Sequence, residues 1–166
     1  MENENTNIIN ENEVESNKNN IEGLEIVTTK AVELKKKDFF KMLAKAEDGL
    51  ALTIDRVGNS FKSKYSNDNG LYPSGIFIDY TFTYEKKDYE IGIYYNLGVP
   101  IAEKKFKLTS GMNVFKIIGV ATDISTAEEI TVTEEFIQDT LTGVTFLAEI
   151  GTSYNGGFLI EPIGLV

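Results

Sequence analysis

The clearest pattern along the chain is an alternation of apolar and polar residues on both sides of one short polar segment. Apolar residues occupy every second position from residue 76 to residue 84 and again from residue 89 to residue 95, with a charged segment at 85–88 between them. Period-two patterning around a short polar turn predicts a β-hairpin with one buried face. A four-residue turn would pair Tyr84 with Tyr89, Phe82 with Ile91 and Tyr80 with Ile93, and on the other face Thr83 with Glu90, Thr81 with Gly92 and Asp79 with Tyr94.

Apolar spacing elsewhere predicts three helices and three further strands. Helices are expected at residues 39–46 after an N-cap at Asp38, from a cap at Thr109 or Ser110 to Gly119, and from Thr133 to Gly143; strands are expected at 50–57, 144–150 and 158–163. Residues 26–29 form a short strand or an extended segment. The single glycine at Gly92 inside the second hairpin strand predicts a bulge or a barrel corner.

This order of elements predicts a mainly β fold with flanking helices, in the α+β class. Five strands with helical segments between the third and the fourth fit a five-stranded OB-fold-like Greek-key barrel. An irregular α+β sandwich is the competing architecture. Residues 1–22 are acidic and rich in asparagine, so we expect a disordered tail there and a single domain at 23–166.

Composition narrows the chemistry that this chain can carry out. Cysteine and histidine are both absent, which removes thiol nucleophiles, imidazole bases and the usual zinc sites. We therefore expect a protein that is not an enzyme and that has no metal or cofactor. No apolar run is long enough for a membrane-spanning helix, and the acidic N-terminus is unlike a signal peptide, so we expect a cytoplasmic protein, in the host cell if it is phage-encoded.

The net charge of −10 argues at first against nucleic acid as a ligand, because lysine and arginine drive that binding. Residues 1–25 hold seven acidic residues and one lysine, a net charge of −6, which leaves −4 for residues 26–166. The folded part is therefore only mildly acidic, and local basic strips remain compatible with the overall charge. The acidic tail is expected to act as a solubility tether, as a partner-recruiting peptide or as a pseudo-substrate that competes for a basic groove.

The C-terminal region resembles the closing hairpin of small phage-encoded OB-fold proteins that bind single-stranded DNA. The matching positions are Leu141, Gly143, Phe146, Ala148, Ile150, Tyr154, Asn155, Gly156 and Ile160. The resemblance extends over residues 50–163 and implies a DNA-binding protein of phage or mobile-element origin that acts in replication or recombination. Such proteins often carry their acidic segment at the C-terminus, whereas this chain carries it at the N-terminus.

Aromatic rings beside cations are what a single-strand site needs, because bases stack on rings and cations follow the phosphates. We expect such a site on the solvent face of the hairpin and on the long segment before it, formed by Phe77, Tyr94, Lys86, Lys87, Arg56, Tyr65, Tyr72, Lys62 and Lys64. In the alternative interpretation, the N-terminal helix covers the two hairpin rings. The lysines at 35, 36, 37, 41 and 45 form either an additional phosphate-contacting strip or, as we favour, a solvated helix face.

Other functional classes have weaker support in the sequence. Asp55, Asp79 and Glu90 lie on strand faces where carboxylates can hold Mg²⁺, but surface acids are common on strands. The expected partners are single-stranded DNA and, through the acidic tail, replication or recombination proteins; a homo-oligomer is compatible and a membrane is not expected. The alternatives are an acidic phage inhibitor that mimics DNA and a structural virion protein without a ligand.

Overall fold

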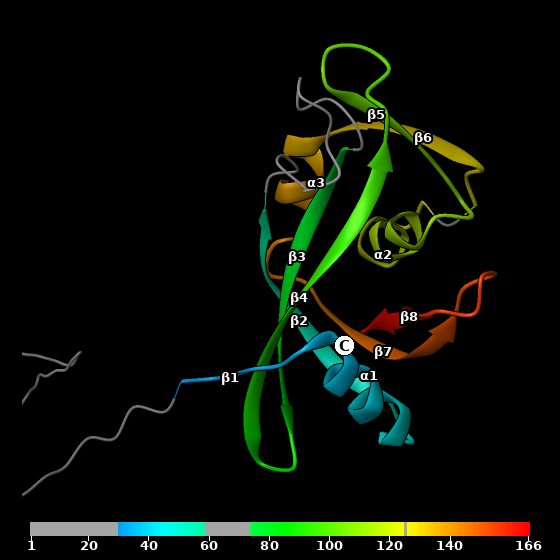
Figure 1. Cartoon of the computed structure of the whole chain (residues 1–166). Helices are drawn as coiled ribbons and strands as arrows, with labels where there is room; N and C mark the ends of the chain where they lie inside the picture. The colour runs from blue at the N-terminus through cyan, green and yellow to red at the C-terminus, as the bar shows by residue number, and fades with distance from the viewer. Residues whose placement is uncertain (1–29, 59–73, 125) are drawn as a thin grey trace, which may run out of the picture. The chain divides into compact units, whose positions relative to one another are not determined.

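A computed structural model describes residues 30–58, 74–124 and 126–166 (Figure 1). The chain divides into two units, Met1–Lys30 and Ala31–Val166, and every described element belongs to the second. The tail boundary expected at residues 22 and 23 and the segment 26–29 lie outside the described residues. The elements are β1 (Val32–Glu33), α1 (Lys36–Lys45), β2 (Leu50–Gly58), β3 (Ser74–Tyr84), β4 (Lys87–Gly98), β5 (Lys105–Thr109), α2 (Asn113–Thr122), β6 (Glu129–Thr133), α3 (Glu134–Leu141), β7 (Thr145–Thr152) and β8 (Phe158–Leu165).

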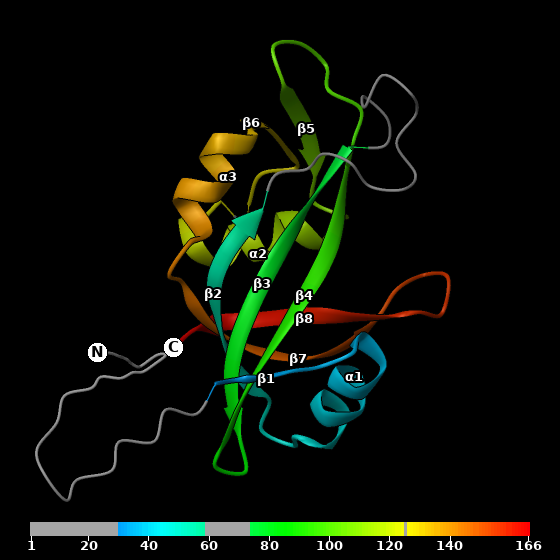
Figure 2. The same cartoon turned by 60° about the vertical axis from the view of Figure 1, so that its left-hand side comes forward.

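The main sheet has six strands in the order β1-β4-β3-β2-β7-β8, and β5 pairs with β6 in a separate two-stranded antiparallel sheet. Strands β2, β3, β4 and β7 form a Greek key, because β7 returns after a long connection to lie beside β2. Figures 1 and 2 show β7 and β8 running across the direction of β3 and β4. The mainly β, α+β class is confirmed, but the sheet is not closed into a barrel, because β4 and β8 do not pair.

The β3–β4 hairpin has the expected faces but a different register. Tyr84 pairs with Lys87, and Glu85 and Lys86 form a two-residue turn in which both residues have positive φ. The predicted pairs were therefore wrong by two residues, because the turn is shorter than the polar segment. A shift of two keeps every side chain on its predicted face. Pairing also continues through Gly92, so the expected bulge at that position is absent.

The helix boundaries show which local signals acted as caps. The predicted start of α3 after Thr133 is confirmed, and the Thr133 hydroxyl caps the helix by accepting a hydrogen bond from the Phe136 amide at 3.0 Å. The two predicted caps, at Asp38 and at Thr109 or Ser110, were wrong: α1 begins at Lys36, with Asp38 in its first turn, and α2 has Met112 at its N-cap. The β5–β6 sheet was not predicted, because each strand has only five residues and α2 lies between them in the chain.

The core lies between the inner face of the sheet and the three helices. Helix α1 contacts β4 and β7, α2 contacts β8, and α3 contacts β2. At the centre of the core, Tyr80 of β3 and Tyr95 of β4 are buried, and their hydroxyls form a hydrogen bond of 2.7 Å. Each hydroxyl thus satisfies the other inside an apolar environment, where an unpaired one would be costly.

We expect this tyrosine pair to be strongly non-additive in mutagenesis. Tyr95→Phe leaves the Tyr80 hydroxyl buried without its partner and should lower the free energy of unfolding by about 1–3 kcal/mol. Adding Tyr80→Phe removes the remaining buried hydroxyl and should restore most of that loss. Urea denaturation of both single variants and the double variant measures the coupling, and additive effects would contradict this account.

The same pair should make the protein sensitive to alkaline pH. Burial raises the pKa of Tyr80 well above its ordinary value, and the neighbouring Tyr95 raises it further. Burial also raises the pKa of Tyr95, against the opposing effect of the hydrogen bond with Tyr80. Unfolded tyrosines ionise near pH 10, so stability should be intact below about pH 10 and fall above it, by about 1.4 kcal/mol per pH unit for each tyrosine. The double phenylalanine variant should lose less stability between pH 9 and pH 11.

Candidate functional site

The predicted site on the outer face of β3 and β4, here called the hairpin face, has two aromatic rings at its centre. Phe77 and Tyr94 are directly paired across the strands, with ring centroids 5.2 Å apart in an edge-to-face arrangement. Phe77 is 44% exposed, so the described helices do not cover it. Tyr94 is half-buried, and its ring lies over Gly75, where a Cβ atom would come within 2.2 Å of the ring.

The charges on the hairpin face do not favour phosphate. Arg56 binds Asp79 through an ion pair of 2.7 Å and a hydrogen bond of 2.9 Å. Gly92 leaves room for this pair, since a Cβ there would lie 2.8 Å from an Asp79 carboxylate oxygen. Glu33 and Glu90 line the same polar groove of about 480 Å³, which has Lys36 as its second cation. The cation predicted to contact phosphate is therefore already neutralised, and the groove holds more carboxylates than cations.

The other predicted residues are not gathered into one site by the described structure. Lys86 and Lys87 are exposed at the β3–β4 turn. Lys62, Lys64, Tyr65 and Tyr72 lie outside the described residues. Among the residues described, no group of three acidic side chains is placed to hold a metal ion, so the three strand carboxylates do not form the Mg²⁺ site considered above.

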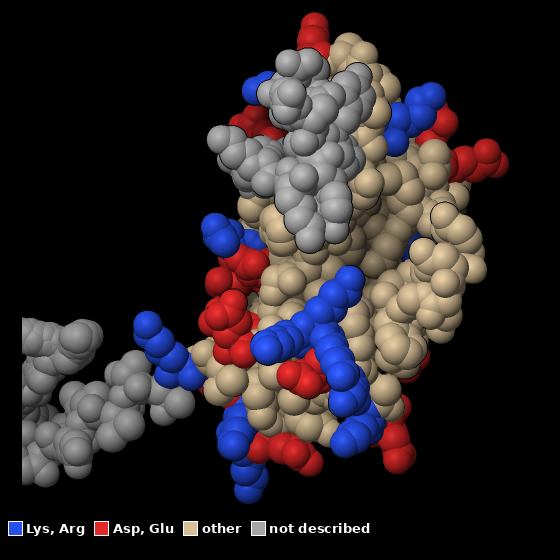
Figure 3. All heavy atoms as spheres, viewed as in Figure 1, with Lys and Arg blue, Asp and Glu red and all other residues tan. Residues whose placement is uncertain are grey.

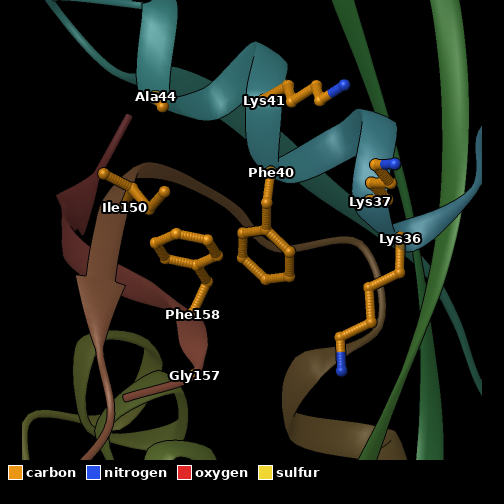
Figure 4. Close-up of a pocket in the computed structure, with 8 residues that line it drawn as sticks. All are labelled: Lys36, Lys37, Phe40, Lys41, Ala44, Ile150, Gly157 and Phe158. Carbon is orange, nitrogen blue, oxygen red and sulfur yellow. The ribbon is translucent and has the colours of Figure 1, made fainter.

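A different groove combines exposed aromatic surface with cations. It has a volume of about 640 Å³, lies between α1 and the β7–β8 hairpin, and is here called the lysine groove (Figure 4). Its lining residues are Lys36, Lys37, Phe40, Lys41, Ala44, Ile150, Gly157 and Phe158. Phe158 is 59% exposed, and its ring centroid lies 6.0 Å from that of the buried Phe40. Figure 3 shows basic side chains gathered over α1, with acidic surface between some of them and uncharged surface beside them.

Helical spacing brings the lysines to this groove. The α1 residues that line it, at positions 36, 37, 40, 41 and 44, follow the three-and-four spacing of one helix face. Lys35, Lys36 and Lys37 occupy the N-cap and the start of the helix, where the positive end of the helix dipole disfavours cations. Helix stability alone therefore does not account for these three lysines, and a local conflict of this kind is typical of a functional site.

The β7–β8 turn supplies the opposite wall of the lysine groove. The Asn155 side-chain oxygen accepts a hydrogen bond from the Gly157 amide at 3.2 Å, and Gly156 has a φ of +88°, which favours glycine. This tight turn leaves Tyr154 fully exposed and places Phe158 at the start of β8. The five lysines of this region are exposed, as predicted for a solvated helix face. Sequence reasoning missed that three of them border a groove, because Phe158 was assigned only to a strand. The available signal was Phe40, an aromatic residue inside the lysine stripe.

Comparisons with protein-family models, with curated proteins and with solved structures find no match to this chain. The likeness to phage single-stranded DNA-binding proteins therefore remains a resemblance of the sequence. In the part of the chain that the structure describes, no helix combines the length and apolar character needed to cross a membrane.

Gly75 is expected to be essential for the packing of the hairpin face. Gly75→Ala introduces a methyl group into the space that the Tyr94 ring occupies, so the ring must move, and we expect the free energy of unfolding to fall by about 1–3 kcal/mol. Gly164→Ala is the matched control, because no heavy atom lies within 4 Å of its Cβ position in β8. Urea denaturation should show a change of at most about 0.5 kcal/mol for the control. Equal effects of the two substitutions would contradict this packing.

Proposed function

We propose that this protein binds single-stranded DNA without acting as an enzyme, and that the lysine groove is the main binding surface. One observation carries the proposal: an exposed phenylalanine, Phe158, lies in an apolar groove whose α1 side carries Lys36, Lys37 and Lys41. Bases that stack on aromatic rings gain about 1–3 kcal/mol each, and lysines beside the rings neutralise the adjoining phosphates.

The charge distribution favours this groove over the hairpin face. None of the three lysines that line it takes part in an ion pair within the described residues, whereas Arg56 is held by Asp79. A phosphate at the hairpin face would have to displace that carboxylate and approach Glu33 and Glu90. Phe77 remains exposed and can extend the stacking surface, but we expect it to contribute less than Phe158.

The fold supports the same proposal at a coarser level. Strands β2, β3, β4, β7 and β8 occur in the sequence order of a five-stranded OB-fold, with helices between the third and fourth, and OB-folds are partly open Greek-key barrels that bind oligonucleotides. Together with the resemblance of the C-terminal hairpin, this order supports a protein of phage or mobile-element origin that acts in DNA replication or recombination. The acidic N-terminal segment is then a candidate for recruiting proteins of those pathways.

Direct binding is the first test of this function. A fluorescence-anisotropy titration with labelled dT20 at 50 mM salt should give a Kd below about 10 µM, because low salt favours counterion release. Binding should weaken steeply as the salt concentration rises. Absence of binding under these conditions would overturn the proposal, and capture of a basic nucleic-acid-binding protein instead would favour the DNA-mimic alternative.

Substitutions should then locate the site. Phe158→Ala should weaken dT20 binding by about 5- to 150-fold through loss of one stacking contact, whereas Phe136→Ala, which removes a comparably exposed ring from α3, should have no effect. Lys37→Gln and Lys41→Gln should each lower the slope of log K against log salt by about 0.7, and the exposed Lys107→Gln on β5 should not change it. Equal effects at the groove and the control positions would place the site elsewhere.

A further inference from the structure

A second groove adjoins the lysine groove and occupies the place where β4 and β8 fail to pair. It has a volume of about 490 Å³ and is here called the gap groove. Its walls come from β4 (residues 93–96), the start of α2 (residues 112–114) and the β7–β8 hairpin (residues 154 and 158–160). Lys36, Phe40 and Phe158 line both grooves, so the two are continuous at these three residues.

The gap groove borders the contact between α2 and β8. The Asn113 side-chain amide donates a hydrogen bond of 2.7 Å to the Ile160 carbonyl and so satisfies an acceptor in β8. That bond holds the start of α2 against β8, while the adjoining surface along β4 remains open. Tyr154, which is fully exposed at the turn, lines the gap groove but not the lysine groove.

The two grooves differ in charge. Lys36, Lys37 and Lys41 all line the lysine groove, whereas Lys36 is the only charged residue among those that line the gap groove. In Figure 4 the Lys36 side chain extends past Phe40 on the side away from Lys41. The gap groove therefore offers aromatic and amide surface with one cation at its entrance, and a ligand there gains little electrostatic attraction of its own.

We propose that the lysine groove and the gap groove form one track for a single strand, with Lys36 contacting the phosphate at the junction. The proposal rests on the function proposed above and defines its substrate class: an unpaired strand long enough to occupy both grooves. A short oligonucleotide fills the lysine groove, where the cations are. A longer strand enters the gap groove as an intramolecular step and stacks on Tyr154, so its affinity rises through effective concentration.

The dependence of affinity on strand length tests this track. We expect the Kd of dT8 to be at least about tenfold lower than that of dT3, because only dT8 reaches both grooves, and we expect little further gain at dT20. Tyr154→Ala should weaken dT8 binding and leave dT3 unchanged. Lys36→Gln should remove most of the difference between dT8 and dT3, whereas Lys37→Gln should weaken both oligonucleotides by the same factor.

The outcomes distinguish failure of the track from failure of the proposed function. Failure of the protein to bind dT20 overturns the proposed function and the track together. Binding of dT20 with no gain from dT3 to dT8, or with Lys36→Gln and Lys37→Gln acting alike, retains the function and overturns the track. Circular dichroism of each variant checks that it is folded, and the substituted side chains are exposed, so we expect no loss of structure.

Discussion

The structure depends on how the inner face of an incompletely closed sheet is covered. Because β4 and β8 do not pair, helices cover the apolar side chains that a closed barrel would enclose. Phe39 of α1 packs against Phe82 with ring centroids 5.6 Å apart and against Phe40 at 5.1 Å. On the other side of the opening, α2 buries Ile117 and Ile118. The helices therefore replace a strand pairing, and their positions decide where the surface is hollowed.

The two grooves follow from this arrangement. Helix α1 covers the core with Phe39 and Leu43, and its adjoining face presents Phe40 and three lysines to the β7–β8 hairpin. Helix α2 covers β8, and the opening along β4 remains as the gap groove. The surfaces proposed to bind DNA thus border the same contacts that stabilise the fold. Replacing Phe40 by a small or polar residue would therefore disturb both the core and the proposed binding surface.

An overall charge of −10 does not prevent a local phosphate site. Salt at physiological concentration screens exposed charges over about 8 Å, so a ligand responds mainly to the charges close to it. On the hairpin face the nearest cation, Arg56, is paired with Asp79, and an exposed pair of this kind contributes little free energy to binding or stability. In the lysine groove the cations lie beside an exposed ring, so the proposed binding depends on the position of charge more than on its sum.

Sequence patterns were most successful where a local signal was sufficient. The α+β class, the faces of the β3–β4 hairpin, the start of α3 and the closing hairpin were predictable, because alternation and helix-start signals act between near neighbours. The register of this hairpin was not predictable, since the polar residues 85–88 do not reveal that only two of them form the turn. Nor was the pairing of Arg56 with Asp79, which depends on two strands lying side by side.

The sequence by itself determined which side chains face inward, which residues can stack and which carry positive charge, because these properties belong to single residues and their periodicity. Only the tertiary structure decided which of them meet. Phe40 and Phe158 are separated by more than a hundred positions along the chain and share one groove, while Phe77 lies beside a neutralised arginine. The physical reason is that a binding surface is made by the packing of distant elements, and that packing here depends on an opening between β4 and β8 that no local pattern reports.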